Sequence, residues 1–200
     1  MKEGARLIGV TGGIGAGKSV VCRILSLRGY LVYDCDIRAK ELMCLEPLAS
    51  GLKEIIGEEA FCDGGCLNRA YISSRLFSYN SIREKVNSLV HAAVRKDVIK
   101  VASCSDLKDN LMFVESAIIS SSGLERMMEK IWCVEAPKEV RLKRVLMRNP
   151  ELSPEDVMKR IAVQEAEYEN IEKHMVAFLF NDNSSSLLLQ IDGQIEALLC

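Results

Sequence analysis

Lys18 and Ser19 follow a glycine-rich segment whose chemistry suits phosphate groups. Residues 11–19 read TGGIGAGKS, with four glycines and a single charged side chain. Glycine adopts positive φ angles and lets the backbone come close to a ligand, so that successive N–H groups can point at phosphate oxygens. A lysine here reaches the β- and γ-phosphates, and a serine hydroxyl binds the Mg²⁺ that bridges them. These residue types indicate a site for a nucleoside triphosphate.

The spacing of this segment fits the P-loop pattern G-x-x-x-x-G-K-[ST], beginning at Gly12. Apolar runs at 7–10 and 20–25 flank it, which predicts strand, loop and helix in that order. A helix that begins near Gly17 adds its N-terminal N–H groups and its dipole. We expect ATP here with Mg²⁺, and Ser19 as the metal contact. The expected ATP contacts in the loop are Gly13, Gly15, Ala16, Gly17, Lys18, Ser19 and Val20.

Two aspartates, Asp34 and Asp36, follow a short β-rich run at 30–33. The order strand, helix, strand predicts a right-handed parallel unit, which puts the end of the second strand beside the P-loop. Ligands of open α/β sheets bind at the carboxyl ends of strands, so we expect both carboxylates near the phosphates. Residues two apart on a strand share a face, and either could be a general base. Asp36 could also be the N-cap of a helix that begins at Ile37.

Three arginines, Arg141, Arg144 and Arg148, share one face of a helix expected from Pro137 to Arg148. Phosphoryl transfer needs guanidinium groups that neutralise the transferring phosphate. A basic stripe of this kind is also typical of a solvated helix face. We expect at least one of these arginines to contact a phosphate.

The segment after this helix predicts a second helix at 154–170, with Ser153 as its N-cap. Asn149 and Pro150 break the chain between the two helices. Two helices joined in this way can close over a nucleotide, and we expect such a lid at 148–170. A plain helical hairpin on the surface is the alternative.

The rest of the chain alternates strands and helices around one helical block at 37–107, which includes a long amphipathic helix at 81–104. The other expected elements are strands at 111–114, 131–134 and 175–180 and a closing helix at 185–199. Five strands with helices between them predict one P-loop domain over 1–200. Its expected fold is a three-layer α/β/α sandwich with a parallel five-stranded sheet. Glu115 follows the third strand, where it could assist Mg²⁺ or pair with a lysine.

The composition is that of an ordinary globular protein, with 200 residues, 48% hydrophobic content and a net charge of −2. No basic tract favours nucleic acid, and no apolar run approaches the ~20 residues of a membrane span. We expect a cytoplasmic enzyme, a monomer or small homo-oligomer, that binds neither nucleic acid nor membrane. The eight cysteines form no C-x-x-C pair and indicate reduced thiols rather than a metal site.

Several motifs spread over the chain resemble the dephospho-CoA kinase family. They are TGGIGAGKS at 11–19, Asp34-Cys35-Asp36, Leu67-Asn68-Arg69, His91, Leu142-Lys143-Arg144, Arg148, Arg160-Ile161, Gln164 and Asn181-Asp182. The pattern T-G-G-I-G-[AS]-G-K-S is far more specific than a general P-loop. The resemblance implies transfer of the ATP γ-phosphate to the ribose 3′-hydroxyl of dephospho-CoA.

The resemblance also implies roles for particular residues. The catalytic groups would be Lys18, Asp36 and Arg144, with Arg148 as a further ATP contact. The helical block at 37–107 would bind the substrate, together with Thr11, Asp34 and His91. A histidine that only packs between helices is the alternative for His91.

Four positions depart from the family pattern. Ala92 stands where proline is usual, Ser121 stands for glutamate, Asn183 for glycine and Val20 for threonine. The change at Ser121 concerns the acceptor side most. Another small-molecule or nucleoside kinase is therefore an alternative, as is a regulatory protein that binds ATP without turnover. The intact Lys18 argues against the regulatory protein.

Overall fold

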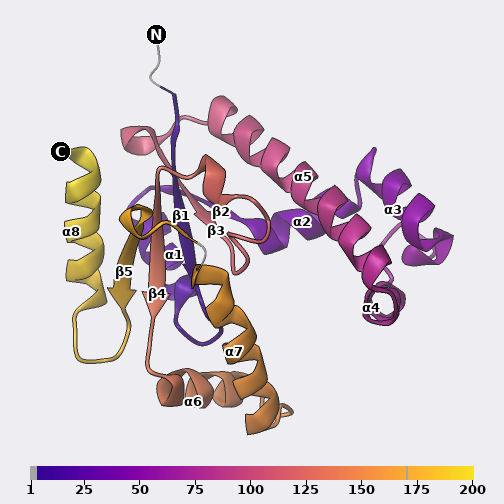
Figure 1. Ribbon diagram of the computed structural model, residues 1–200. Coiled ribbons are helices and arrows are strands. Elements are labelled where there is room, and N and C mark those ends of the chain that lie inside the picture. Colours follow the sequence, from indigo (N-terminus) through magenta and orange to yellow (C-terminus); the bar gives the residue numbers. More distant parts are fainter. Residues whose placement is uncertain (1–3, 170) are drawn as a thin grey trace. The chain divides into compact units, whose positions relative to one another are not determined.

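The computed structural model describes residues 4–169 and 171–200 (Figure 1). The described residues form two compact units. The larger unit contains the chain up to Tyr33 together with the chain from Ala102 onward, and the smaller unit is Asp34–Val101. The sheet and the P-loop belong to the larger unit.

The larger unit is built on a five-stranded sheet with the order β2-β3-β1-β4-β5. The strands are β1 (Arg6–Gly12), β2 (Leu31–Asp34), β3 (Leu111–Glu115), β4 (Lys130–Glu135) and β5 (Val176–Phe180). Neighbouring strands run parallel, with Val10 of β1 opposite Glu115 of β3 and Thr11 opposite Cys133 of β4. The predicted α/β fold with a parallel sheet is confirmed. The first two strands are not neighbours, as the expected strand, helix, strand unit would have it, because β3 lies between β2 and β1.

Alternating side chains of β1 pack on the two faces of this sheet. Ile8 and Val10 are fully buried in a cluster that includes residues of α1 (Lys18–Leu27) and α8 (Leu187–Leu199). Side chains of a strand alternate between its faces, so Gly9 faces the opposite way. A Cβ on Gly9 would overlap Ile119, which shows that the segment after β3 covers the second face closely. The core therefore lies on both sides of the strand that carries the P-loop.

Two helices, α6 (Lys138–Arg148) and α7 (Pro154–Glu169), follow β4 and pack on each other. Their contact is an apolar cluster around Val145, Val157 and Ile161, which also includes the side chain of Ile14 from the P-loop. The predicted N-cap of α7 is present, because the Ser153 hydroxyl accepts the Asp156 N–H at 3.1 Å and lies 2.8 Å from the Asp156 carboxylate. This helical pair is thus packed on the P-loop.

The smaller unit consists of helices with a core of their own. Its helices are α2 (Cys35–Met43), α3 (Leu48–Ile56), α4 (Arg69–Ser78) and most of α5 (Asn80–Cys104). Leu52, Ile56, Ala60, Ile72 and Val86 form a buried apolar cluster in it. The long helix predicted at 81–104 is confirmed by α5.

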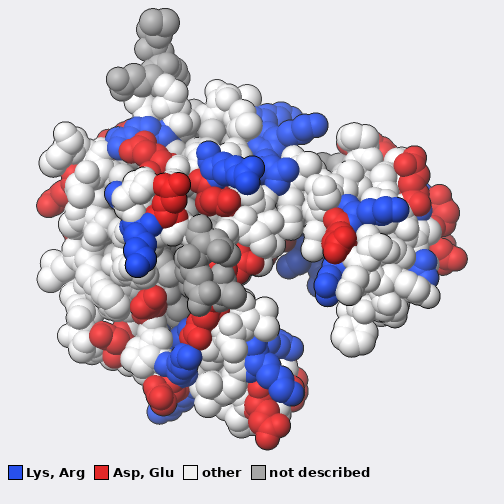
Figure 2. Space-filling view, in the orientation of Figure 1, with Lys and Arg blue, Asp and Glu red and all other residues white. Residues whose placement is uncertain are grey.

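No helix in the described ranges combines the length and the apolar character needed to cross a bilayer. Basic and acidic side chains are interspersed over the region of α6 and α7 in Figure 2. The described residues contain no group of three or more histidine, cysteine or acidic side chains suited to hold a metal ion.

Candidate active site

The P-loop ends at Gly17, whose backbone adopts a conformation that favours glycine. Its φ is 105°, in the left-handed region, and it is the N-cap of α1. A Cβ at this position would also overlap the side-chain amide of Asn181. The Gly17 carbonyl accepts the N–H groups of Val20 and Val21 at 3.0 and 3.3 Å. Helix α1 thus begins at the end of the loop, and the first N–H groups of a helix bind anions.

The Lys18 side chain turns back toward the beginning of the loop. Its Nζ donates to the Gly12 carbonyl at 2.7 Å. Burial raises the pKa of the Cys133 thiol on β4 to about 12, and the nearby cations of Lys18 and Arg141 act in the opposite direction. Both cations therefore lie close to the end of β4, which pairs with β1. The Ser19 side chain is exposed in the first turn of α1.

Arg144 of α6 connects the P-loop with the segment after β5. Its Nη1 donates to the carbonyls of Gly15 and Ala16 at 3.3 and 3.5 Å. Its Nη2 donates to the Asn181 carbonyl at 3.1 Å and to the Asn183 side chain at 3.3 Å. The predicted catalytic arginine is therefore held against the helix end of the loop.

Arg141, one turn earlier on α6, lies at the strand end of the same loop. It is only 6% exposed, and its Nε donates to the Ile14 carbonyl at 3.0 Å. Its guanidinium lies directly against Gly13, where a Cβ would overlap Nη2 and Cζ. Arg148 is exposed, and its Nε donates to the neighbouring Asn149 at 3.2 Å. Arg141 and Arg144 of the predicted stripe thus contact the P-loop.

Thr11 and Glu115 stand near the ends of adjacent strands of the sheet. Thr11 is fully buried on β1, and its hydroxyl has no hydrogen-bond partner within residues 4–169 and 171–200. Glu115 is the last residue of β3 and is half-buried. Both residues therefore belong to the edge of the sheet from which the P-loop emerges.

Three further residues predicted for the acceptor side, Asp34, Asp36 and His91, belong to the smaller unit. Asp34 is the N-cap of α2, because its Oδ1 accepts the Ile37 N–H at 2.9 Å. The alternative that Asp36 is this N-cap is wrong, since α2 begins at Cys35 and Asp36 lies exposed in its first turn. His91 lies partly buried on α5.

Two residues at the site gave weaker signals in the sequence. Asn181 belongs to the Asn181-Asp182 motif, to which the sequence assigned no role. Its amide donates to the Ala16 carbonyl at 2.8 Å. Its position directly after β5 was a usable signal, because ligand contacts gather at the carboxyl ends of strands. Glu165 of α7, 3.5 Å from Arg141 Nη1 and 3.0 Å from Lys138 Nζ, had no such signal. Its role depends on how α7 packs on α6.

A parallel sheet whose first strand leads into a glycine loop, a lysine and a helix, with arginines from a later helix against that loop, defines a P-loop kinase. The sequence profile of the dephospho-CoA kinase family matches residues 6–188. This chain belongs to that family.

Individual relatives agree with this assignment. A dephospho-CoA kinase of Porphyromonas gingivalis is 38% identical over 161 residues, which are 80% of this chain and 78% of that protein. A dephospho-CoA kinase of Bacteroides fragilis is 35% identical over 185 residues, 92% of this chain and 88% of that protein. A crystal structure of a Thermus thermophilus protein superposes with a TM-score of 0.78 at 29% identity, over 98% of this chain and 97% of that one.

Proposed function

We propose that this protein transfers the γ-phosphate of ATP to the ribose 3′-hydroxyl of dephospho-CoA, which gives coenzyme A and ADP in the cytoplasm. Membership of the family supports the acceptor. The observation that supports ATP as the donor is the P-loop with its two cations. Lys18 donates to the Gly12 carbonyl, and Arg144 donates to the carbonyls of Gly15 and Ala16. Positive charges at this loop would neutralise a bound polyphosphate.

The donor would bind as its Mg²⁺ complex. Mg²⁺ retains several waters and is commonly held by one or two protein oxygens together with substrate phosphates. The exposed Ser19 hydroxyl in the first turn of α1 suits that role, and Glu115 at the end of β3 is a second oxygen donor at the same edge of the sheet. When bound, the ion supplies positive charge to the phosphate oxygens.

The acceptor side of the proposal gives Asp36 the role of general base. The Asp34 carboxylate already accepts a backbone N–H as the cap of α2. Asp36 is exposed in the first turn of that helix. In the sequence α2 directly follows β2, and ligands of open α/β sheets bind at the carboxyl ends of strands. An exposed carboxylate suits the orientation or deprotonation of a ribose hydroxyl.

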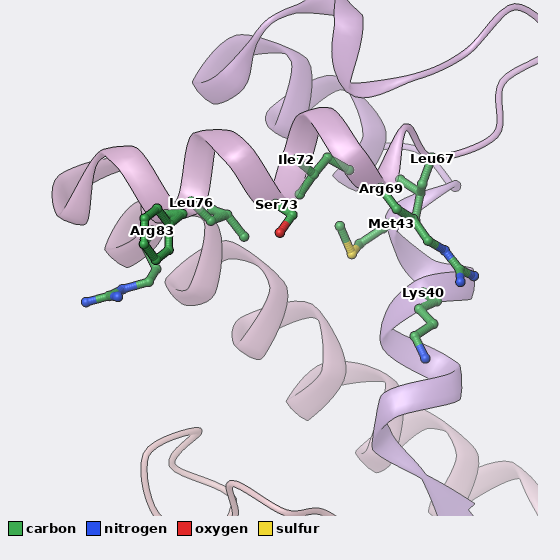
Figure 3. Close-up of a pocket in the computed structure, with 9 residues that line it drawn as sticks. Lys40, Met43, Leu67, Arg69, Ile72, Ser73, Leu76 and Arg83 are labelled. Carbon is green, nitrogen blue, oxygen red and sulfur yellow. The ribbon is translucent and has the colours of Figure 1, made fainter. Parts of the chain in front are cut away.

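A pocket in the smaller unit supports substrate binding there. It has a volume of about 460 Å³ between α2, α4 and α5 (Figure 3). Apolar side chains, among them Met43, Ile72 and Leu76, form its floor, and Lys40 and Arg69 bring their charged groups to one side. Dephospho-CoA joins a diphosphate to a long flexible arm. Cations beside an apolar floor are complementary to those two parts.

Removing Lys40 and Arg69, two of the three cations that line this pocket, should weaken binding of the acceptor selectively. We expect Lys40→Ala with Arg69→Ala to raise KM for dephospho-CoA about tenfold or more, because charge-assisted bonds to a phosphate are lost. KM for ATP should stay close to the wild-type value. Steady-state kinetics with each substrate varied in turn would measure this. Lys85→Ala, an exposed cation of α5, is the matched control. An equal rise in both KM values would contradict the assignment of this pocket to dephospho-CoA.

A coupled ADP-release assay tests the reaction itself. With ATP and Mg²⁺, we expect turnover with dephospho-CoA at least ~10²-fold above that with adenosine or AMP, since only the full acceptor supplies binding energy from remote parts. Mass spectrometry of the product should show one added phosphate on dephospho-CoA. If ADP release with dephospho-CoA does not exceed the background rate, the proposal is refuted. Faster turnover with adenosine than with dephospho-CoA would favour a nucleoside kinase.

A further inference from the structure

Arg141 carries a hydrogen-bond donor that the protein does not use. The side chain is only 6% exposed. Its Nε donates to the Ile14 carbonyl, and its Nη1 faces the Glu165 carboxylate. Its Nη2 is buried and has no acceptor among the described residues. A buried donor on a charged group is costly to leave unpaired, so this one calls for an acceptor from outside the chain.

The unused donor lies at the end of the loop that receives the terminal phosphates. The guanidinium is against Gly13, and the neighbouring Gly12 carbonyl accepts Lys18 Nζ. The P-loop lysine reaches the β- and γ-phosphates, so Arg141 shares the end of the loop that serves them. Arg144 contacts Gly15 and Ala16 at the other end. The two arginines therefore contact opposite ends of the loop.

A cavity of about 450 Å³ opens beside Gly13 and the Arg141 guanidinium. Its charged lining residues are Glu135, Lys138, Arg141 and Glu165. The Glu165 carboxylate lies 3.0 Å from Lys138 Nζ and 3.5 Å from Arg141 Nη1. Glu165 thereby fixes one edge of the guanidinium and leaves Nη2 as the edge without a partner.

We propose that Arg141 binds the terminal phosphate of the triphosphate donor through Nη2, and that the enzyme thereby binds ATP in preference to ADP. Glu165 is the positioning residue that holds the guanidinium in place. The inference rests on the proposed function for the identity of the donor. A contact that only the triphosphate can make favours binding of ATP and release of ADP.

The test compares two nucleotides without the acceptor. Titration calorimetry with Mg²⁺ would give Kd values for ADP and for a non-hydrolysable ATP analogue in the full chain. For Arg141→Gln we expect the analogue to bind about tenfold more weakly, as for a lost hydrogen bond to a charged group, with ADP within about twofold of wild type. Glu165→Gln should give a smaller loss in the same direction. Lys143→Gln, which removes an exposed cation from α6, should change neither Kd.

Equal weakening of both nucleotides by Arg141→Gln would make the residue purely structural and overturn the inference. So would a variant that binds the analogue as tightly as wild type. If Arg141→Gln unfolds, Arg141→Lys keeps the charge but not the fork, and it must still weaken the analogue more than ADP. A wild type that prefers the analogue but does not phosphorylate dephospho-CoA would sink the proposed acceptor while leaving the role of Arg141 intact.

Discussion

Lys18→Ala is expected to lower kcat by about 10³-fold, because it removes a preorganised charge from the transferring phosphate. KM for ATP should rise as well, since the lysine also contacts the bound triphosphate. The Nζ of Lys18 rests on the Gly12 carbonyl at 2.7 Å, so the ammonium is already at the loop before any ligand binds. Coupled ADP release, measured over a range of ATP concentrations, would separate the two effects.

Two variants control this experiment. Lys18→Arg keeps the charge in a planar, longer group and should still lose most of kcat, because the loop is shaped for a compact ammonium. Arg23→Ala removes an exposed cation from the same helix and should leave kcat within about twofold and Tm close to wild type. A folded Lys18→Ala protein that keeps more than a tenth of the wild-type kcat would contradict the assignment.

The P-loop could be predicted from the sequence because its determinants are local. Apolar runs on both sides specify the strand and the helix, and Gly17 is needed for a backbone that other residues rarely adopt. The five strands were likewise recognisable as short apolar runs between helices, and all five are present. These features need no knowledge of distant contacts.

The order of the strands could not be predicted in the same way. A strand, a helix and a second strand in sequence predict parallel pairing, yet β3 lies between β1 and β2. The β3 strand is nearly 80 residues further along the chain than β2, beyond the helices of the smaller unit. Which strand fills that place depends on packing across the whole sheet, and local spacing contains no information about it.

The sequence also could not show which arginines of α6 contact the P-loop. Periodicity put Arg141, Arg144 and Arg148 on one face, but seven residues advance a helix by about 10 Å. The loop is short, and Arg141 and Arg144 alone contact its two ends among these three. Sequence spacing gives the direction of a side chain around the helix axis. Where the P-loop lies along that axis is a property of the fold.

Asp36→Asn is expected to lower kcat by ~10² or more while KM for ATP stays near the wild-type value, as for a positioned base. Asparagine keeps the shape of the side chain and removes its basicity. Asp36 is exposed and does not cap α2, so the substitution should have little effect on Tm. Single-turnover measurements with saturating dephospho-CoA would report the chemical step directly.

Asp34→Asn distinguishes the two carboxylates. Asparagine is as good an N-cap as aspartate, so α2 should keep its first turn and the bond to the Ile37 N–H. The remaining loss should then appear mainly in KM for dephospho-CoA, in line with a substrate contact rather than a base. If Asp34→Asn instead abolishes the chemical step and Asp36→Asn does not, the two roles must be exchanged, and the residue that caps the helix is also the base.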